Sequence, residues 1–344
     1  MLLFHQPDNT SRDITHGLFA VFGVGLIGSA VTHSLGHLAN WRGERMPLSW
    51  DDADLQGQQL GHIACRITHL LDAMPGSNQP SLNAKPSCVP RFQILWSAGR
   101  AGFGATEAEA ALEMNSFSAV AEQVQQIASL FPQIPVTFHH ISSAGGLFEG
   151  QRGIRKCSVP SIRRPYGFLK LSQEMLLNSM GPHIIKRIYR LTSIIGPAVG
   201  PHRRGLVGKL IDDGLHHRTT CLVGLPSTLR DYVWHSDVGR HIAECVLNNE
   251  RADTPCTHIL ASAKPSSIHE VIDVVESIFG RRLYTKTSPL LSNDVDTTVS
   301  PEVLPAEWCA TDLFTCTSRI YRDALAFEAI QHHGEPRLAA KETA

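Results

Sequence analysis

Cysteine pairs, long apolar runs and an excess of one charge are all missing from this sequence. Its eight cysteines include no C-x-x-C pair, which argues against a zinc framework and against a disulfide scaffold. The most apolar stretch, Gly17 to Val31, is too short and too rich in glycine for a membrane span, and it lacks the pattern of a secretory signal. We therefore expect a cytoplasmic protein with reduced thiols and no membrane partner.

The charge balance excludes a further class of function. The chain has 31 Lys and Arg residues against 32 Asp and Glu, a formal net charge of −1, so it has no global basic field to hold a nucleic acid. Hydrophobic residues make up 42% of its 344 positions, enough for a sizeable buried core. The 18 histidines include no H-E-x-x-H motif, and we expect no metal site.

Strand-like and helical patterns alternate along the first two thirds of the chain, which predicts an α/β fold with a Rossmann-like, doubly wound parallel sheet. The apolar run at 17–28 turns rich in glycine and is followed by a helical pattern to about 39, so a strand, a tight turn and a helix are expected there. The further expected strands are 46–50, 92–96, 136–141 and 184–195, and the further expected helices are 52–73, 106–131 and 166–180. Residues 1–16 are interpreted as a loose terminus and 75–90 as a surface loop. From residue 196 the alternation becomes irregular, which indicates a smaller C-terminal lobe.

A glycine-rich turn stands between the first long strand and the first helix. Gly23, Gly25 and Gly28 form G-x-G-x-x-G, the spacing that lets a turn approach a pyrophosphate at a helix N-terminus. The motif predicts a dinucleotide site that also includes Leu26 and Ile27. Asp51 lies 23 residues after Gly28, close to where an acid accepts the ribose hydroxyl of NAD. Two alternatives remain at this point: Asp51 or Asp52 caps the next helix, or Arg42 and Arg45 accept the additional phosphate of NADP.

A tyrosine and a lysine stand at helical i, i+4 spacing in Tyr166-Gly167-Phe168-Leu169-Lys170. An ammonium near a phenol favours the phenolate, so Tyr166 would exchange a proton with a substrate hydroxyl as general acid and base. The simpler alternative is a lysine that lies beside a tyrosine on a helix surface.

Six segments in order give the chain its resemblance to a known family. They are FGVGLIG at 22–28, WSAG at 96–99, ISSAGGLFEG at 141–150, RRPYGFLKLSQE at 163–174, RLTSIIGP at 190–197 and RDYVWHSDV at 230–238. Together they resemble the NAD-dependent epimerase/dehydratase family, extended short-chain dehydrogenases/reductases that act on nucleotide sugars. The resemblance implies NAD as cofactor, Tyr166 and Lys170 as catalytic residues, Ala98 and Gly99 against the cofactor, and a homodimer.

Four departures from the family pattern concern the substrate side. The usual Ser or Thr is replaced by Ala144, so Ser143 is the nearest hydroxyl that could replace it, or it only forms hydrogen bonds at a strand end. Gly145-Gly146 stands where related 4,6-dehydratases carry Asp-Glu, which disfavours dehydration. Ser193 replaces an asparagine of the substrate site. The family's later arginine is missing at 289–292, for which Arg203, Arg204 and Lys209 could compensate.

The family's diphosphate-binding arginine corresponds to Arg230, which could instead pair with Asp231 or Asp237. The sequence thus predicts an NAD-dependent epimerase or oxidoreductase for a nucleotide-activated sugar, in polysaccharide synthesis if the resemblance holds. A reductase of another carbonyl compound and a non-catalytic cofactor-binding protein are the alternatives. The expected domains are 12–196 with about 229–262 for the cofactor, 197–228 with about 263–325 for the substrate, and a mobile tail at 326–344.

Overall fold

The computed structural model describes residues 1–5, 17–38, 41–74, 90–197, 205–248, 255–288 and 295–334. Its largest element is a seven-stranded sheet of β1 (Leu2–His5), β2 (Gly17–Phe22), β3 (Arg42–Arg45), β4 (Arg91–Trp96), β5 (Val136–Ser143), β6 (Ile184–Leu191) and β11 (Cys256–Leu260). The strand order is β11-β6-β5-β4-β2-β1-β3. The five strands from β11 to β2 are parallel, as the alternation of strands and helices predicts.

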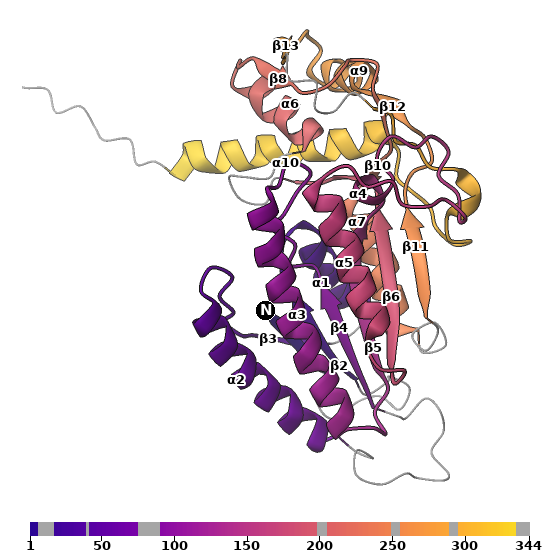
Figure 1. Ribbon diagram of the computed structural model, residues 1–344. Coiled ribbons are helices and arrows are strands. Elements are labelled where there is room, and N and C mark those ends of the chain that lie inside the picture. The colour runs from indigo at the N-terminus through magenta and orange to yellow at the C-terminus, as the bar shows by residue number, and fades with distance from the viewer. Residues whose placement is uncertain are drawn as a thin grey trace, which may run out of the picture.

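Helices cover both faces of the sheet (Figure 1). One face carries α2 (Ala53–Asp72), α3 (Glu107–Leu130) and α5 (Pro165–Ser179), and the other carries α1 (Leu26–Leu38) and α7 (His235–Leu247). The ends of these helices follow local sequence rules. Thr106 and Glu109 form a capping box at the start of α3, and Pro165 occupies the first position of α5. The sequence therefore predicts α2, α3 and α5 to within about two residues.

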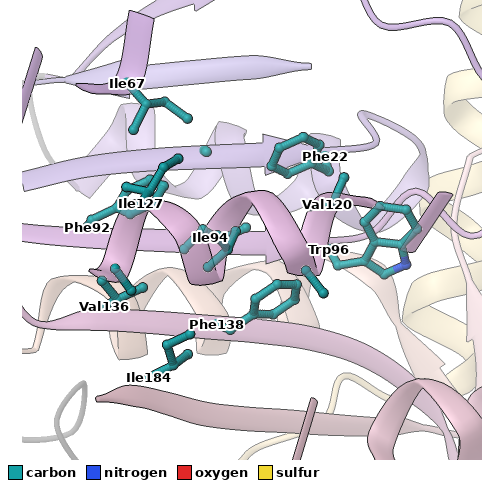
Figure 2. Packing of buried hydrophobic residues seen from close by; sticks show 14 of the residues in the cluster. Phe22, Ile67, Phe92, Ile94, Trp96, Val120, Ile127, Val136, Phe138 and Ile184 are labelled. Atoms are coloured by element: carbon teal, nitrogen blue, oxygen red, sulfur yellow. The ribbon is translucent and has the colours of Figure 1, made fainter. Parts of the chain in front are cut away.

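Apolar side chains from the strands fill the space between the sheet and the helices on each face. Phe92, Ile94 and Trp96 alternate along β4 and pack toward α2 and α3 (Figure 2). Leu95 points to the opposite face, where it packs with α1 and α7. Because both faces are covered, β2 and β4 are buried at every position, and the sheet holds its carboxyl edge rigidly for the site above it.

Two expectations for the first 50 residues are wrong. Residues 2–5 are not a loose terminus: they form β1, which pairs antiparallel with β2 on one side and β3 on the other. The sheet thus begins before residue 12. The expected strand 46–50 is also absent, because the strand lies earlier, at 42–45. Met46, Leu48 and Trp50 do pack against the core, but from an extended segment outside any ladder.

A smaller lobe lies beyond the carboxyl edge of the sheet (Figure 1). It contains α6 (Leu206–Leu215), β8 (Thr220–Leu222), α9 (Ile268–Phe279), β13 (Thr285–Thr287) and α10 (Leu313–Gly334), with a core of its own. Two short strand pairs join the lobe to the sheet, β7 (Ser193–Ile195) with β10 (Tyr232–Trp234) and β9 (Leu229–Arg230) with β12 (Ser266–Ser267).

The lobe accounts for two further differences from the sequence analysis. The expected strand 184–195 is interrupted at Thr192, whose hydroxyl donates to Asp231 Oδ1 at 3.1 Å, and the chain then pairs with β10. The expected tail from 326 is helical as far as Gly334. The expected loop at 75–89 lies outside the described residues. None of the helices in the described ranges is long and apolar enough to cross a membrane.

Candidate active site

The glycine turn lies at the carboxyl end of β2. Gly23 has φ +90°, and a Cβ there would lie 2.3 Å from the Cα of Ala98. A Cβ at Gly28 would lie 2.0 Å from the carbonyl oxygen of Gly23. Both positions therefore require glycine for the turn and for the packing of α1, as the motif predicts. The hydroxyl of Ser97 closes the turn by donating to Gly23 O at 2.6 Å.

The middle glycine of the motif faces open space. A Cβ at Gly25 would meet no protein atom within 4 Å, so the fold itself does not require glycine at this position. Leu26, the first residue of α1, is half-buried and lines a cleft. The side chain of Ile27, in contrast, is buried in the core, which leaves only its backbone for a ligand. An open position at a helix N-terminus is the geometry that accommodates a phosphate group.

At the carboxyl end of β5, the side chains of the adjacent residues Ser143 and Ala144 have different surroundings. The Ser143 hydroxyl caps α4 (Ala144–Leu147) by accepting a hydrogen bond from Gly146 N at 3.0 Å, and Ser143 also lines the cleft. Ala144 is fully buried and packs against Leu147 and Phe148. Ser143 therefore has the structural role of a strand-end hydrogen bond and also lies at the cleft.

Tyr166 lies against this turn from α5. A Cβ at Gly146 would be 3.0 Å from the Tyr166 ring and 3.4 Å from the Ser143 hydroxyl. Gly146 therefore leaves the room in which the ring and the hydroxyl approach each other. Tyr166 is half-buried and lines the same cleft as Ser143.

Lys170 lies behind Tyr166, one helical turn along α5. Its Nζ is 5.7 Å from the centre of the Tyr166 ring, and a Cβ at Gly99 would lie 3.4 Å from it. The ammonium donates to Glu113 Oε1 and Gln173 Oε1, both at 3.0 Å. Glu113 stands in none of the motifs, but the sequence does hold one signal of its role: an acid interrupts the apolar face that Ala110, Phe117 and Val120 define on α3.

The cleft has a volume of about 540 Å³ and lies between the carboxyl edge of the sheet and the lobe. Its lining includes Leu26, Ser143, Tyr166, Ser193, Lys209 and Arg230. Lys209 also pairs with Asp213 at 3.0 Å. Arg203 and Arg204 lie outside the described residues. The structure thus brings the expected catalytic and substrate residues together, with Lys170 enclosed behind Tyr166.

Arg230 is anchored by backbone groups on the lobe side of the cleft. Its guanidinium donates to Leu229 O at 3.0 Å and to Val295 O. Burial lowers its pKa, an effect that Tyr232 and nearby carboxylates oppose. Of its expected ion-pair partners, Asp231 accepts from Thr192 and Ser262.

The other expected partner, Asp237, accepts from the backbone N–H and hydroxyl of Thr311 and pairs with Arg240. Both aspartates therefore accept hydrogen bonds from groups other than Arg230.

Asp51 does not follow the strand next to β2. On the side away from β4 the neighbour of β2 is β1, and Asp51 comes six residues after the edge strand β3. Its exposed carboxylate pairs with Arg100, which follows Gly99. Asp52, in turn, caps α2 by accepting from Leu55 N at 3.0 Å, so the capping alternative is confirmed for Asp52.

A doubly wound sheet with a glycine turn at its carboxyl edge and a C-terminal lobe across the cleft defines an α/β protein of the Rossmann type. No protein-family model matches the sequence, and no curated protein matches it. Solved structures of UDP-sugar epimerases share the fold. UDP-glucose 4-epimerase of Thermus thermophilus, in complex with NAD, gives a TM-score of 0.67 at 16% identity, over 89% of this chain and 99% of that chain.

Two further structures give similar values. UDP-glucose 4-epimerase of Thermotoga maritima, with UDP-glucose, gives a TM-score of 0.63 at 16% identity over 89% of this chain and 99% of that one. UDP-glucuronic acid 4-epimerase of Bacillus cereus, with UDP-glucuronic acid and NAD, gives 0.61 at 17% identity over 90% and 99%. The resemblance to the NAD-dependent epimerase/dehydratase family is thus confirmed at the level of the fold.

Proposed function

We propose that this protein is an NAD-dependent enzyme that epimerises, or oxidises and reduces, a nucleotide-activated sugar. The observation that carries the proposal is the meeting of Ser143, Tyr166 and Arg230 on one cleft that reaches the glycine turn at Leu26. A proton-exchanging phenol, a second hydroxyl and a half-buried cation at the cleft are the groups that such a reaction needs. The shared fold of UDP-sugar epimerases supports the same assignment.

The residues at the carboxyl edge of the sheet fit NAD. The turn at residues 23–28 leaves open space at Gly25, and Gly99 places no side chain beside the Lys170 ammonium, which would lie 3.4 Å from a Cβ there. We propose Gly23, Gly25, Leu26, Ile27 and Gly28 for the pyrophosphate side, and Ala98, Gly99, Tyr166 and Lys170 for the nicotinamide side. Bound NAD would supply the acceptor and donor of a hydride. Asp51, exposed and paired with Arg100, stays a candidate for the adenosine side.

Tyr166 would be the general acid and base. Its phenolate would take the proton of a sugar hydroxyl as the carbon is oxidised, and its phenol would return that proton when the carbonyl is reduced. The Lys170 ammonium near the ring stabilises the phenolate. The Ser143 hydroxyl lies on the other side of Gly146 and would hold the reacting sugar oxygen. No acid or base follows Ser143 in the turn, since positions 145 and 146 are glycines, so elimination of water is disfavoured.

The lobe side of the cleft would bind the nucleotide part. Arg230 presents a guanidinium whose position two carbonyl oxygens fix, which suits charge-assisted bonds to a diphosphate. Ser193 and Lys209 line the same side. We further propose a homodimer formed through α3 and α5, on which Leu112, Phe168 and Met175 are exposed; light scattering would test it. A cytoplasmic location remains a prediction from the sequence.

Turnover assays with UDP-glucose, UDP-N-acetylglucosamine and UDP-glucuronic acid test the proposal, with and without added NAD. An epimerase yields the isomeric sugar without net NADH, and a dehydrogenase accumulates NADH. Tyr166→Phe removes only the ionisable hydroxyl and should lower kcat about 10²- to 10⁴-fold while NAD binding survives. Tyr284→Phe, which alters an exposed tyrosine of the lobe, is the matched control. Full activity of Tyr166→Phe on a confirmed substrate contradicts the proposed mechanism.

A further inference from the structure

Lys170 and Glu113 form an enclosed ion pair. The exposed fraction is 5% for the lysine side chain and 3% for the glutamate side chain. In the other ion pairs of buried carboxylates within the described ranges, the cation is more exposed. The exposed fraction of the side chain is 20% for Arg190, which pairs with Glu174, and 24% for Arg164, which pairs with Glu149. Enclosing both charges removes hydration that their attraction only partly replaces. General stability is therefore a weak explanation for a charged pair at this position.

The Glu113 carboxylate joins two segments of the site. Oε1 accepts from Lys170 Nζ at 3.0 Å and from Gln173 Nε2 at 3.1 Å. Oε2 accepts from the backbone N–H groups of Arg100 and Ala101, both at 2.7 Å. One oxygen thus holds the lysine of α5, and the other holds the loop after β4 that contains Ala98 and Gly99.

The charge of this carboxylate is stabilised by the same four contacts. Burial alone would raise the pKa of Glu113, but the Lys170 ammonium and hydrogen bonds from Ala101, Lys170 and Gln173 lower the pKa below its usual value. The side chain is therefore ionised at neutral pH, and it compensates the Lys170 charge. Removing the carboxylate charge would leave the buried Lys170 ammonium without its counter-charge.

We propose that Glu113 is a positioning residue that fixes the Lys170 ammonium and the Ser97–Ala101 loop relative to each other, so that both present their cofactor-facing groups in register. The inference rests on the proposed function, because it takes Lys170, Ala98 and Gly99 as the nicotinamide side of the site. It predicts that Glu113 affects cofactor affinity and kcat together, and the sugar KM little, although the carboxylate touches neither ligand.

Three variants test the inference. Glu113→Gln keeps the size and removes the charge, and Glu113→Asp keeps the charge and shortens the reach. Glu174→Gln serves as the matched control. It removes the charge of another buried carboxylate on α5, which pairs with Arg190 at 2.7 Å. Each protein is measured for NAD dissociation constant, kcat, sugar KM and melting temperature. Hydrogen exchange at the Arg100 and Ala101 amides is measured without cofactor.

We expect Glu113→Gln to raise the NAD dissociation constant and lower kcat by at least about tenfold each, with faster exchange of the Arg100 and Ala101 amides. Glu113→Asp should recover part of both effects. Glu174→Gln should lower the melting temperature and leave NAD affinity and those amides unchanged. A folded Glu113→Gln protein with wild-type NAD affinity and kcat would overturn this inference and leave the proposed function standing.

Two results separate the remaining cases. If the wild-type protein neither binds NAD nor turns over a nucleotide sugar, the proposed function fails and this inference fails with it. If Glu113→Gln does not fold, the double variant Glu113→Gln, Lys170→Gln takes its place, because it leaves no unpaired buried charge. The double variant is compared with Lys170→Gln. Faster exchange of the Arg100 and Ala101 amides in the double variant supports the inference, and unchanged exchange of those amides overturns it.

Discussion

The carbonyl oxygen of Gly146 lies so close to Gly167 that a Cβ at position 167 would be 2.4 Å from it. This contact brings the first turn of α5 onto α4, and it lays the Tyr166 ring against the turn that Ser143 caps. The glycine after the tyrosine therefore determines how closely the two hydroxyl-bearing side chains approach.

Gly167→Ala should consequently destabilise the protein and displace Tyr166. We expect the free energy of unfolding to fall by about 1–3 kcal/mol, the usual cost of overpacking, and kcat to fall with it. Gly61→Ala on α2 is the control, because a Cβ there meets nothing within 4 Å and alanine favours a helix. Urea unfolding measures the free energy of unfolding of both variants. Equal stability of Gly167→Ala and wild type would show that the contact relaxes without cost.

Gly25→Val should abolish NAD binding without a large loss of stability. A Cβ at Gly25 meets no protein atom within 4 Å, so the added branched side chain would occupy the space proposed for the pyrophosphate. Gly36→Val is matched to it, since Gly36 lies on the exposed face of α1, the helix that begins directly after Gly25, and is equally open. Calorimetric titration with NAD compares the two. Unchanged NAD affinity of folded Gly25→Val would place the dinucleotide elsewhere.

Ser143→Ala decides whether its hydroxyl has taken over the position at which the family carries a Ser or Thr. We expect kcat to fall almost as far as in Tyr166→Phe, and stability to fall by about 1 kcal/mol through loss of the cap on α4. Ser143→Thr keeps the hydroxyl and should retain activity. Adding Ala144→Ser to Ser143→Ala should restore nothing, because residue 144 is enclosed in the core. Restoration by that second change would contradict the assignment to Ser143.

Elements whose pattern is local could be predicted, and those that depend on distant partners could not. The capped helices α2 and α3 and the strands β4 and β5 carry their signals within one segment. The four residues of β1 form a strand only because β2 and β3 flank them. The alternation of Met46, Leu48 and Trp50 does reflect burial, but among the described residues the pairing of this segment ends at Met46, whose backbone bonds to Met1.

The site follows the same division. Gly23, Gly28, Tyr166 and Lys170 stand in short motifs, so their grouping at one edge could be predicted from the sequence. The contact of Glu113 with Lys170 spans 57 positions, and no motif joins the two. The pairing of Asp51 with Arg100 spans 49 positions, and no motif predicts it either, whereas the hydrogen bond that Asp52 accepts from Leu55 N is local.

Arg230→Ala should raise the sugar KM at least about tenfold, or 1.4 kcal/mol of lost binding, with NAD affinity unchanged. Arg230→Lys should recover only part, since an ammonium lacks the fork that can bind a diphosphate in two places. Arg152→Ala is the control: this nearby exposed arginine pairs with Asp296 and does not line the cleft. Weakened NAD binding with an intact sugar KM would contradict the assignment of Arg230 to the diphosphate.

Stability should fall with acid because two histidines are enclosed. His139 and His140 are fully buried on β5, and burial, together with Arg187 for the first and Lys170 for the second, lowers the pKa of each well below its usual 6.5. Below about pH 6.5 the unfolded chain gains protons that the folded chain does not take up. The free energy of unfolding should therefore decrease as the pH falls, by up to about 1.4 kcal/mol per pH unit for each histidine.

The two histidines differ in their partners, and this difference gives a matched pair of variants. His139 bonds to Tyr189 at 3.0 Å and to Gln93 at 2.9 Å, whereas neither ring nitrogen of His140 has a hydrogen-bond partner among the described residues. His140→Leu should stabilise the protein by about 1–3 kcal/mol and reduce the acid slope by one proton. His139→Leu should destabilise it, because two buried polar groups lose their partner. Urea unfolding between about pH 5 and pH 7.5 measures both, and an unchanged slope in His140→Leu would mean that His140 is protonated in the folded state.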